Sequence, residues 1–523
     1  MTGTRAQVSR KIPKQRSAMV LIMVLVVVAF LALGSYAFSD LMLAHQESAE
    51  LSIRQTQTRA LVDSGLDSVK LFLFSTPDIR LEQGGIYDNP TLFKGRTVID
   101  DPDPNFRGSF AVVAPSLDSS GNYGGLRYGL EDESTRLNLN TLLALEAQSE
   151  GSGKNLLMAL PGMTEDVADA ILDWIDEDDE ARDLGAEIDY YSGLSPAYAC
   201  KNGPLETVEE LLLVRGVTPA LLFGADVNRN GTIDPHEAEG ESANSSQGVA
   251  DDGSYSGSGW ASYLTLYSME SNLSADGSPR IYLNNDDLNT LYTSLSEKFP
   301  AEWATFIVAY RQNGPYTGSQ EATSGAQGTL DMTRPARFPL SQLLDLVGAK
   351  TRVRFSGEIS SVVLNSPIPA EIGAMNIFLP QLMDGATINP ATTIPGRINV
   401  NQASATILRG IPGMDEDIVN QIITRRSADP GTDQPGRQYE TWLLAEGVVT
   451  LDEMKLLQPF ICGGGQVFRA QVVGYFQGGS AASRAEAIFD ATTAAPRLVF
   501  WRDISHLGRG FALETLGVDY TEQ

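Results

Sequence analysis

A change from apolar to polar positions divides the N-terminal part of the chain. Residues 18–38 form a nearly unbroken apolar run behind a basic leader, and polar, helix-favouring sequence continues to about residue 74, with no Pro or Gly in the polar part before Gly65. At about 1.5 Å per helical residue, the apolar run can cross the roughly 30 Å hydrocarbon core of a bilayer. The pattern predicts one long helix over residues 18–76, with residues 18–39 in the lipid bilayer. The basic leader 1–17 predicts that the N-terminus stays in the cytoplasm.

Three interpretations of this N-terminal segment are open from the pattern alone. A cleaved secretory signal would end in a small-residue site, which residues 32–37 could supply. A plain signal anchor would keep the whole segment. In the third interpretation the leader is cut on the cytoplasmic side of the apolar run, and the retained helix serves first as a membrane anchor and later as a packing element in a filament. The polar extension of the helix favours the third.

Strand-like alternation occurs in two stretches that lie far apart in the sequence, 107–133 and 466–502. One antiparallel sheet that both stretches share, packed on the N-terminal helix, uses these strands most economically. The segment between them has largely helical periodicity, for example at 287–295 and 301–311, and would be a large insertion. Two polar stretches inside it, 238–259 and 313–328, are typical of a flexible loop and a linker. The predicted fold class is therefore α+β.

The insertion contains an internal repeat. Each copy has an Asn-x-Asn entry, a helix, a Pro-Gly pair and a second helix, with the Pro-Gly pairs at residues 161–162 and 412–413. Pro fixes φ, Gly allows a tight turn, and Thr164 or Asp415 can cap the helix that follows. This is a helix-hairpin-helix signature, which either presents amides to a DNA phosphate or forms a SAM-like packing module. Acidic sequence directly after the first copy would repel phosphate and favours packing.

Composition and charge exclude several classes of function. The net charge is −28 and the pI is about 4.5, so the chain cannot bind nucleic acid by releasing counterions. The two cysteines, Cys200 and Cys462, form no CxxC, which excludes a zinc knuckle or a redox motif; they either pair or remain separate thiols. Catalytic signatures such as GxSxG, a P-loop or HExxH do not occur, and we predict that the protein is not an enzyme.

One twelve-residue stretch, 226–237, has the spacing of an EF-hand calcium loop. Gly231 stands at position 6, where the loop turns sharply. Ca²⁺ takes six to eight oxygen ligands, and this spacing wraps oxygen donors around one ion. The expected ligands occupy loop positions 1, 3, 5, 7, 9 and 12: Asp226, Asn228, Asn230, Thr232 (through its carbonyl), Asp234 and Glu237. A polar turn without metal is the alternative.

A second acidic cluster follows the first repeat copy and fits no standard loop. Its carboxylates would repel one another without a cation, so it is either a solvated acidic face or a second Ca²⁺ site. The cluster comprises Asp173, Asp176, Asp178, Asp179 and Glu180, followed by Glu187 and Asp189.

Four sequence features together resemble a known family, the K-class minor pseudopilins of the type II secretion system. They are a prepilin-type leader at 14–25, the motif 160–180 with 185–191, the motif 201–219, and the second repeat copy from 397 onward. The resemblance implies a pilin-like long helix on a small antiparallel sheet, with an inserted α-helical domain of two SAM-like modules. Family members bind calcium near the acidic segment, which matches Asp176 to Glu180 and Glu187 here.

The resemblance also implies a place and a role in the cell. The protein would be a single-pass inner-membrane protein with its C-terminal domain in the periplasm, at the pseudopilus tip. Its partners would be other minor pseudopilins and the inner-membrane secretion platform, with no nucleic acid. Prepilin peptidase would cut between Ser17 and Ala18, with N-methylation, and Ile22 would stand where most pseudopilins have Glu. The alternative is a membrane-anchored DNA-uptake or type IV pilus assembly protein.

These expectations divide the chain into seven segments. They are the leader (1–17), the pilin helix (18–76), the first part of the sheet (77–135), a first SAM-like module with the acidic segment and the EF-hand-like loop (136–260), a helical and linker region (261–396), a second SAM-like module (397–464) and the C-terminal strands (465–523).

Overall fold

The computed structural model describes residues 17–234, 237, 257–322, 328–429 and 434–518. The predictions for the leader, for most of the polar stretch 238–259 and for part of the linker 313–328 concern residues outside these ranges.

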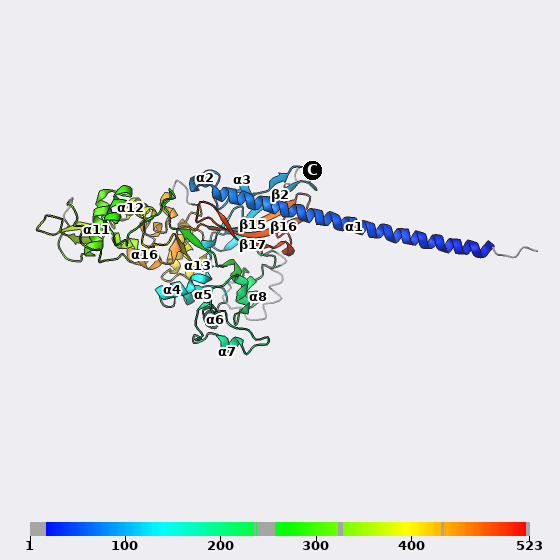
Figure 1. Ribbon diagram of the computed structural model, residues 1–523, viewed down its shortest axis with the longest axis horizontal. Helices are drawn as coiled ribbons and strands as arrows, with labels where there is room; N and C mark the ends of the chain where they lie inside the picture. Colours follow the sequence, from blue (N-terminus) through cyan, green and yellow to red (C-terminus); the bar gives the residue numbers. More distant parts are fainter. Residues whose placement is uncertain (1–16, 235–236, 238–256, 323–327, 430–433, 519–523) are drawn as a thin grey trace, which may run out of the picture.

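A single helix of 58 residues, α1 (Ser17–Phe74), forms a rod that projects from the body of the molecule (Figure 1). Its first half is exposed and is long and apolar enough to cross a membrane. Its second half buries Leu61, Val62, Val69 and Phe72. The predicted long helix, apolar first and amphipathic later, is confirmed.

The second half of α1 packs on an antiparallel sheet with the order β1-β2-β15-β16-β17; β3 also pairs with β2, and β4 with β15. In the centre of the sheet Val112 of β2 lies opposite Val472 of β15, so the predicted sheet of early and late strands is confirmed. The strands are β1 (Arg96–Ile99), β2 (Gly108–Leu117), β3 (Tyr123–Arg127), β4 (Glu131–Asp132), β15 (Val467–Phe476), β16 (Ala482–Asp490) and β17 (Arg497–Asp503), and two short helices, α2 (Pro77–Glu82) and α3 (Pro90–Phe93), precede or flank them.

Alternation along the strands gives the sheet two apolar faces. Phe110 and Val112 face α1, whereas Ala111 and Val113 face a second small core closed by the C-terminal segment around Phe511. The sheet is therefore covered by α1 on one side and by the end of the chain on the other.

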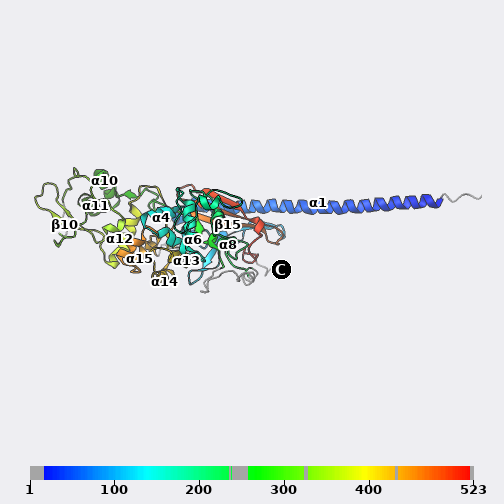
Figure 2. The ribbon, with the colours of Figure 1, turned by 90° about the horizontal axis from the view of Figure 1, so that it is seen from below.

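Part of the inserted domain, with α11 and α12, lies beyond the end of the sheet away from the exposed half of α1 (Figures 1 and 2), and another part, with α6 to α8, lies below the sheet in the view of Figure 1. Buried side chains from Leu137 to Ile461 form one continuous apolar core, so both repeat copies and the segment between them pack as one body.

The helices of the inserted domain are η1 (Glu133–Thr135), η2 (Leu139–Thr141), α4 (Leu142–Gln148), α5 (Ser152–Met158), α6 (Glu165–Ile175), α7 (Ile188–Tyr191), η3 (Val208–Leu213), α8 (Pro219–Phe223), η4 (Trp260–Ser262), α10 (Leu288–Lys298), α11 (Ala301–Asn313), η5 (Leu343–Leu346), α12 (Ile372–Gly385), α13 (Ala405–Arg409), α14 (Glu416–Arg425), η6 (Pro435–Gln438), α15 (Trp442–Ala445) and α16 (Leu451–Leu457). Its short strands are β5 (Leu137–Asn138), β6 (Leu264–Thr265), β7 (Met269–Ser271), β8 (Ile281–Tyr282), β9 (Lys350–Val353), β10 (Val362–Asn365), β11 (Ala386–Thr387), β12 (Thr393–Pro395), β13 (Ile398–Asn399) and β14 (Ile461–Cys462).

The two repeat copies are built alike at their entries. Asn138 and Asn399 each accept a hydrogen bond from the backbone N–H two residues on. The strands that carry them, β5 and β13, each make a parallel two-residue pairing with a later strand, β6 and β14. The second Asn of each entry then ties down the chain that follows: Asn140 bonds the backbone of Leu205 in the first copy.

The Pro-Gly turns follow the sequence prediction, but the caps do not match between copies. Gly162 and Gly413 have φ of 69° and 84°, in the left-handed region that favours glycine. Asp415 caps α14 by accepting from the N–H of Ile418 at 2.8 Å. Thr164 makes no such bond at the start of α6, so the prediction that it caps this helix is wrong.

Candidate functional site

Three acidic side chains of the first repeat copy converge at the end of α6. Asp173 lies in its last turns, Asp176 follows directly, and Glu187 precedes α7 after the chain has turned back. Each offers a carboxylate oxygen within 4.8 Å of the others, and all three are buried. We call these residues the acidic trio.

One cation of the chain partly neutralises the acidic trio. Arg182 donates from Nη1 to Asp173 at 2.6 Å and to Asp176 at 2.5 Å, and the N–H of Ala186 donates to Asp173 at 2.7 Å. Glu187 is left out: both of its carboxylate oxygens are buried without a hydrogen-bond partner, as is Oδ1 of Asp176.

Burial, followed by the charge of Asp176, raises the pKa of Glu187 to about 7. The thiol of Cys200 interacts with this carboxylate, but it is a weak donor and its hydrogen bond goes to the carbonyl oxygen of Asp173 at 3.7 Å. Cys200 and Cys462 are both free thiols in this structure.

Orphaned carboxylate oxygens in a buried acidic site fit a divalent cation. A buried charge without a partner is costly, and hard oxygen donors are the ligands that Ca²⁺ prefers. The geometry selects Asp176 and Glu187 from the predicted ligands and adds Asp173, which the sequence places in the acidic cluster.

Asp178, Asp179 and Glu180, which were also predicted as ligands, are exposed and lie outside the acidic trio. Asp178 accepts from the N–H of Glu180 at 2.9 Å, and Asp179 accepts from the side chain of Asn202 at 2.8 Å. The sequence cannot separate the two groups, because only the direction in which the chain turns after α6 decides which carboxylates face inward.

The EF-hand-like loop, residues 226–237, is closed by its first and last acids. Asp226 accepts from the N–H groups of Asn230 and Gly231 at 3.0 and 2.8 Å. Glu237 accepts from the N–H groups of Asn228 and Asp234 at 3.1 and 3.0 Å. The carboxylates at positions 1 and 12 therefore both bind backbone N–H groups of the loop itself.

Side chains at the other predicted ligand positions also face one another. Asp234 accepts from the amide groups of Asn228 and Asn230 at 2.8 and 3.2 Å. Asn230 accepts from the backbone N–H of Thr232 at 2.8 Å. Oδ1 of Asn228 is buried without a partner, and Gly231 has a φ of 80° at the sharp turn. The orphaned oxygen and the glycine turn fit a cation held by the loop.

The EF-hand-like loop lies against the sheet rather than at a free edge of the inserted domain. Gln471 on β15 donates to the carbonyl of Arg229 at 2.9 Å, and Asn230 donates to the carbonyl of Gly510 at 2.7 Å. Arg484 on β16, which is fully buried, donates to the carbonyl of Asn228.

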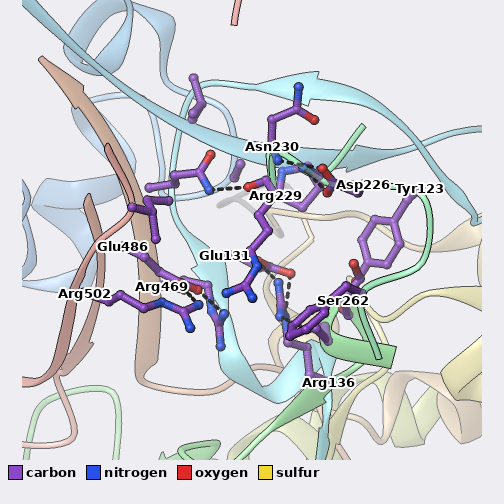
Figure 3. A pocket seen from close by; sticks show the side chains of 18 of the residues that line it. Tyr123, Glu131, Arg136, Asp226, Arg229, Asn230, Ser262, Arg469, Glu486 and Arg502 are labelled. Atoms are coloured by element: carbon purple, nitrogen blue, oxygen red, sulfur yellow. Dashed lines mark hydrogen bonds and ion pairs between the residues drawn. The ribbon is translucent and has the colours of Figure 1, made fainter. Parts of the chain in front are cut away.

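Beside this loop, residues of the sheet and of the inserted domain together line a cavity of about 100 Å³ (Figure 3). Its charged side chains form a network in which Glu486 sits between Arg469 and Arg502. Burial alone would raise the pKa of Glu486, but the two guanidinium groups outweigh burial and lower this pKa to about 2. Arg502 and Arg229 also share Glu209 of η3, so the network joins sheet and insertion.

A membrane-length helix packed on an antiparallel sheet, with strands from both ends of the chain, defines a membrane-anchored protein of pilin-like α+β fold. Residues 135–223 match the model of the first domain of the type II secretion system protein K family. Over these residues the chain is similar to protein K of the type II secretion system. The match contains the motifs 160–180 and 201–219 and confirms the resemblance to the K class.

Among solved structures, the chain is similar to a chain of the crystal structure of the GspK-GspI-GspJ complex from the type 2 secretion system of enterotoxigenic Escherichia coli. The identity is 12%, the similarity covers 88% of this chain and 98% of that chain, and the TM-score is 0.35. Similarity at this level supports no further argument. No curated protein matches the sequence significantly.

Proposed function

We propose that this protein is a minor pseudopilin at the tip of a type II secretion pseudopilus, where it helps to export proteins across the outer membrane. The observation that carries the proposal is the segment similar to protein K inside a pilin-like scaffold. The apolar half of α1 would sit in the inner membrane before assembly and against neighbouring helices afterwards, with the rest of the chain in the periplasm. The role is structural, without catalysis.

The bulky inserted domain supports a place at the tip. A chain with part of its inserted domain beyond the sheet, away from the membrane-length helix, would block further subunits above it (Figures 1 and 2). Its partners would be other minor pseudopilins below it and the inner-membrane platform.

We further propose that the two repeat copies are SAM-like modules that serve packing rather than DNA binding. The turn of the first copy supports this, because Trp260 donates from its indole to the carbonyl of Pro161 at 2.8 Å and covers the hairpin from inside the protein.

Calcium would stabilise the inserted domain at the acidic trio and at the EF-hand-like loop. Support comes from the orphaned oxygens of Glu187, Asp176 and Asn228, which a cation would satisfy. Calcium would also replace part of the neutralisation that Arg182 supplies in the acidic trio.

The N-terminal sequence of the mature protein, from membranes with and without an active prepilin peptidase, tests the pseudopilin assignment. We expect a peptidase-dependent start at Ala18, with N-methylation. An intact leader, or a start near Ser35 or Phe38 that does not depend on the peptidase, would overturn it. Loss of type II cargo from the medium when the gene is deleted, restored by the full chain, would establish the role in secretion.

A further inference from the structure

We propose that the EF-hand-like loop, residues 226–237, is a calcium-dependent fastener that holds the inserted domain on the pilin sheet. The inference rests on the proposed calcium binding by this loop and goes beyond it, because it assigns the ion a role between two parts of the chain rather than within one. The loop starts after the segment that matches the protein K family, which ends at residue 223.

The first step of the argument is where the contacts of the loop go. Three consecutive loop residues each make a hydrogen bond to the pilin part of the chain: the carbonyl of Asn228 to Arg484 on β16, the carbonyl of Arg229 to Gln471 on β15, and the side chain of Asn230 to the carbonyl of Gly510. The loop thus contacts two central strands and the C-terminal segment at once.

The second step is the charge network beside these contacts. Arg229 of the loop shares Glu209 of the inserted domain with Arg502 of β17. Its side chain lies over the ring of Phe223, 4.2 Å from the ring centroid to its guanidinium carbon. A shift of the loop would therefore withdraw one of the two guanidinium groups that bind Glu209 at the junction of η3 with the sheet.

The third step is that the three residues that contact the sheet, at loop positions 3 to 5, lie within the predicted ring of calcium ligands. Positions 3 and 5 are predicted ligands, and position 4, Arg229, has a left-handed φ of 54°. Without an ion, hydrogen bonds within the loop hold this shape: Asp226 and Glu237 accept from backbone N–H groups, and Asp234 accepts from the side-chain amides of positions 3 and 5. Ca²⁺ bound by carboxylate and carbonyl oxygens would fix the same backbone and hence the three atoms that contact the sheet.

A metal ion that binds only the ordered form of a loop stabilises that form, and with it every contact that the ordered loop makes. Calcium would therefore tighten the junction as a whole, including the segment around Gly510. Removal of calcium would loosen the junction while leaving the cores on either side intact, because those cores consist of apolar side chains.

Hydrogen–deuterium exchange on the full chain in detergent micelles, with Ca²⁺ or with a chelator, tests the fastener. We expect chelation to speed exchange at least fivefold in peptides covering the loop and in peptides covering residues 505–513. Peptides from the core of α11 should be unaffected. Calcium titration calorimetry on the same samples counts the bound ions.

Three variants separate the possible outcomes. Glu237→Gln removes a ligand and should lower the calcium count by one and speed exchange at 505–513 even with calcium present. Gln471→Ala changes only the sheet side and should keep the calcium count while weakening the response at 505–513. Glu187→Gln, in the acidic trio, should lower the count but leave 505–513 protected.

Two results would overturn the proposal, and they differ. If Glu237→Gln lowers the calcium count but exchange at 505–513 does not respond to calcium, the loop binds the ion and is not a fastener. If Glu237→Gln leaves the calcium count unchanged, the loop is not a calcium site, and the fastener falls together with that assignment while the pseudopilin role stands.

Discussion

At the scale of single residues, the molecule places most of its buried charges in pairs and leaves a few unsatisfied. Arg136 with Glu131 and Arg469 with Glu133 are close pairs, at 2.6 Å each, whose burial is matched by a partner. Glu187 has no such partner. Because an unpaired buried carboxylate is unfavourable, Glu187 marks a place where something from outside the chain can bind.

Changing Glu187→Gln tests this directly. The amide cannot ligate Ca²⁺ as a carboxylate does, so we expect the affinity of the acidic trio to fall at least about tenfold, or about 1.4 kcal/mol. In calcium-free buffer above pH 7, where Glu187 is mostly ionised, the same change should raise the melting temperature by about 1 to 3 °C, because a neutral group is buried in place of a charge. Calorimetric titration and a thermal melt measure the two effects. Glu180→Gln is the matched control; equal loss of affinity there would refute the acidic trio as the site.

Glu486 predicts that the stability of the folded protein falls in acid. Its pKa is lowered to about 2 in the folded protein, mainly by Arg469 and Arg502 against the effect of burial, and an unfolded Glu titrates near 4.3. Its contribution to stability is therefore fully present above pH 4.3 and is lost as the pH falls through about 2. By linkage it amounts to about 3 kcal/mol.

Urea unfolding between pH 2 and 7 checks this contribution. Glu486→Gln should lower the stability at pH 7 and flatten its decline below pH 4.3. An equal slope in the variant and the parent would show that other carboxylates cause the acid sensitivity.

At the scale of elements, the sequence predicts the type and order of helices and strands better than the hydrogen bonds that cap the helices. The two Pro-Gly hairpins look equivalent in sequence, and their glycines do adopt the same left-handed conformation. Yet Asp415 caps its helix and Thr164 does not, because rotation of one side chain decides the bond and no pattern in the sequence reports that rotation. The motif 201–219 likewise contains a short 3-10 helix, Val208–Leu213, whose bounds no pattern in the sequence marks.

The contact between α1 and β15 depends on a glycine. A Cβ at Gly474 would lie 2.4 Å from the carbonyl oxygen of Thr58 and 2.8 Å from the N of Val62, both in the backbone of α1. Since the helix backbone cannot yield as a side chain can, Gly474→Ala should displace α1 and cost about 1 to 3 kcal/mol. Thermal unfolding of the detergent-solubilised protein gives the loss.

Gly373→Ala is the control for this variant. It lies in the first turn of α12 with nothing within 4 Å of the added Cβ. It should be neutral or raise stability by up to about 1 kcal/mol, since Ala favours helix over Gly. If Gly474→Ala were equally harmless, the close approach of helix and strand would be wrong.

At the scale of the whole molecule, the order of hydrophobic patterns was enough to predict that strands near residue 110 and near residue 470 share one sheet. Helix and strand periodicities are local signals, and few arrangements cover both apolar faces. The acidic trio was predictable only in part, because its members are spread over α6 and the chain that returns after it. The single core of the insertion was not foreseen, since nothing local in the sequence shows which modules pack together.

The topology of the sheet predicts that the insertion can be replaced by a short hairpin. Asp132 of β4 pairs with Phe468 of β15, so the chain leaves the sheet and returns to it at neighbouring positions. Joining Glu133 to Val467 through Asn-Gly would turn this pair into a two-residue hairpin of a favoured type. Arg469 keeps both Glu133 and Glu486, so the shortened chain retains the ion pairs that lie on the sheet itself, whereas Glu209 and Arg229 are removed with the insertion.

We expect the shortened chain to fold into α1 on its sheet and to reach the membrane, but not to restore secretion in a deletion strain. Circular dichroism and a cooperative thermal transition in detergent would show the fold, and cargo in the medium would report secretion. A chain that ends before β15 is the control and should lose the transition, because the central strands of the sheet are missing. If the shortened chain also fails to fold, the pilin part depends on the core of the insertion, and the two are one folding unit.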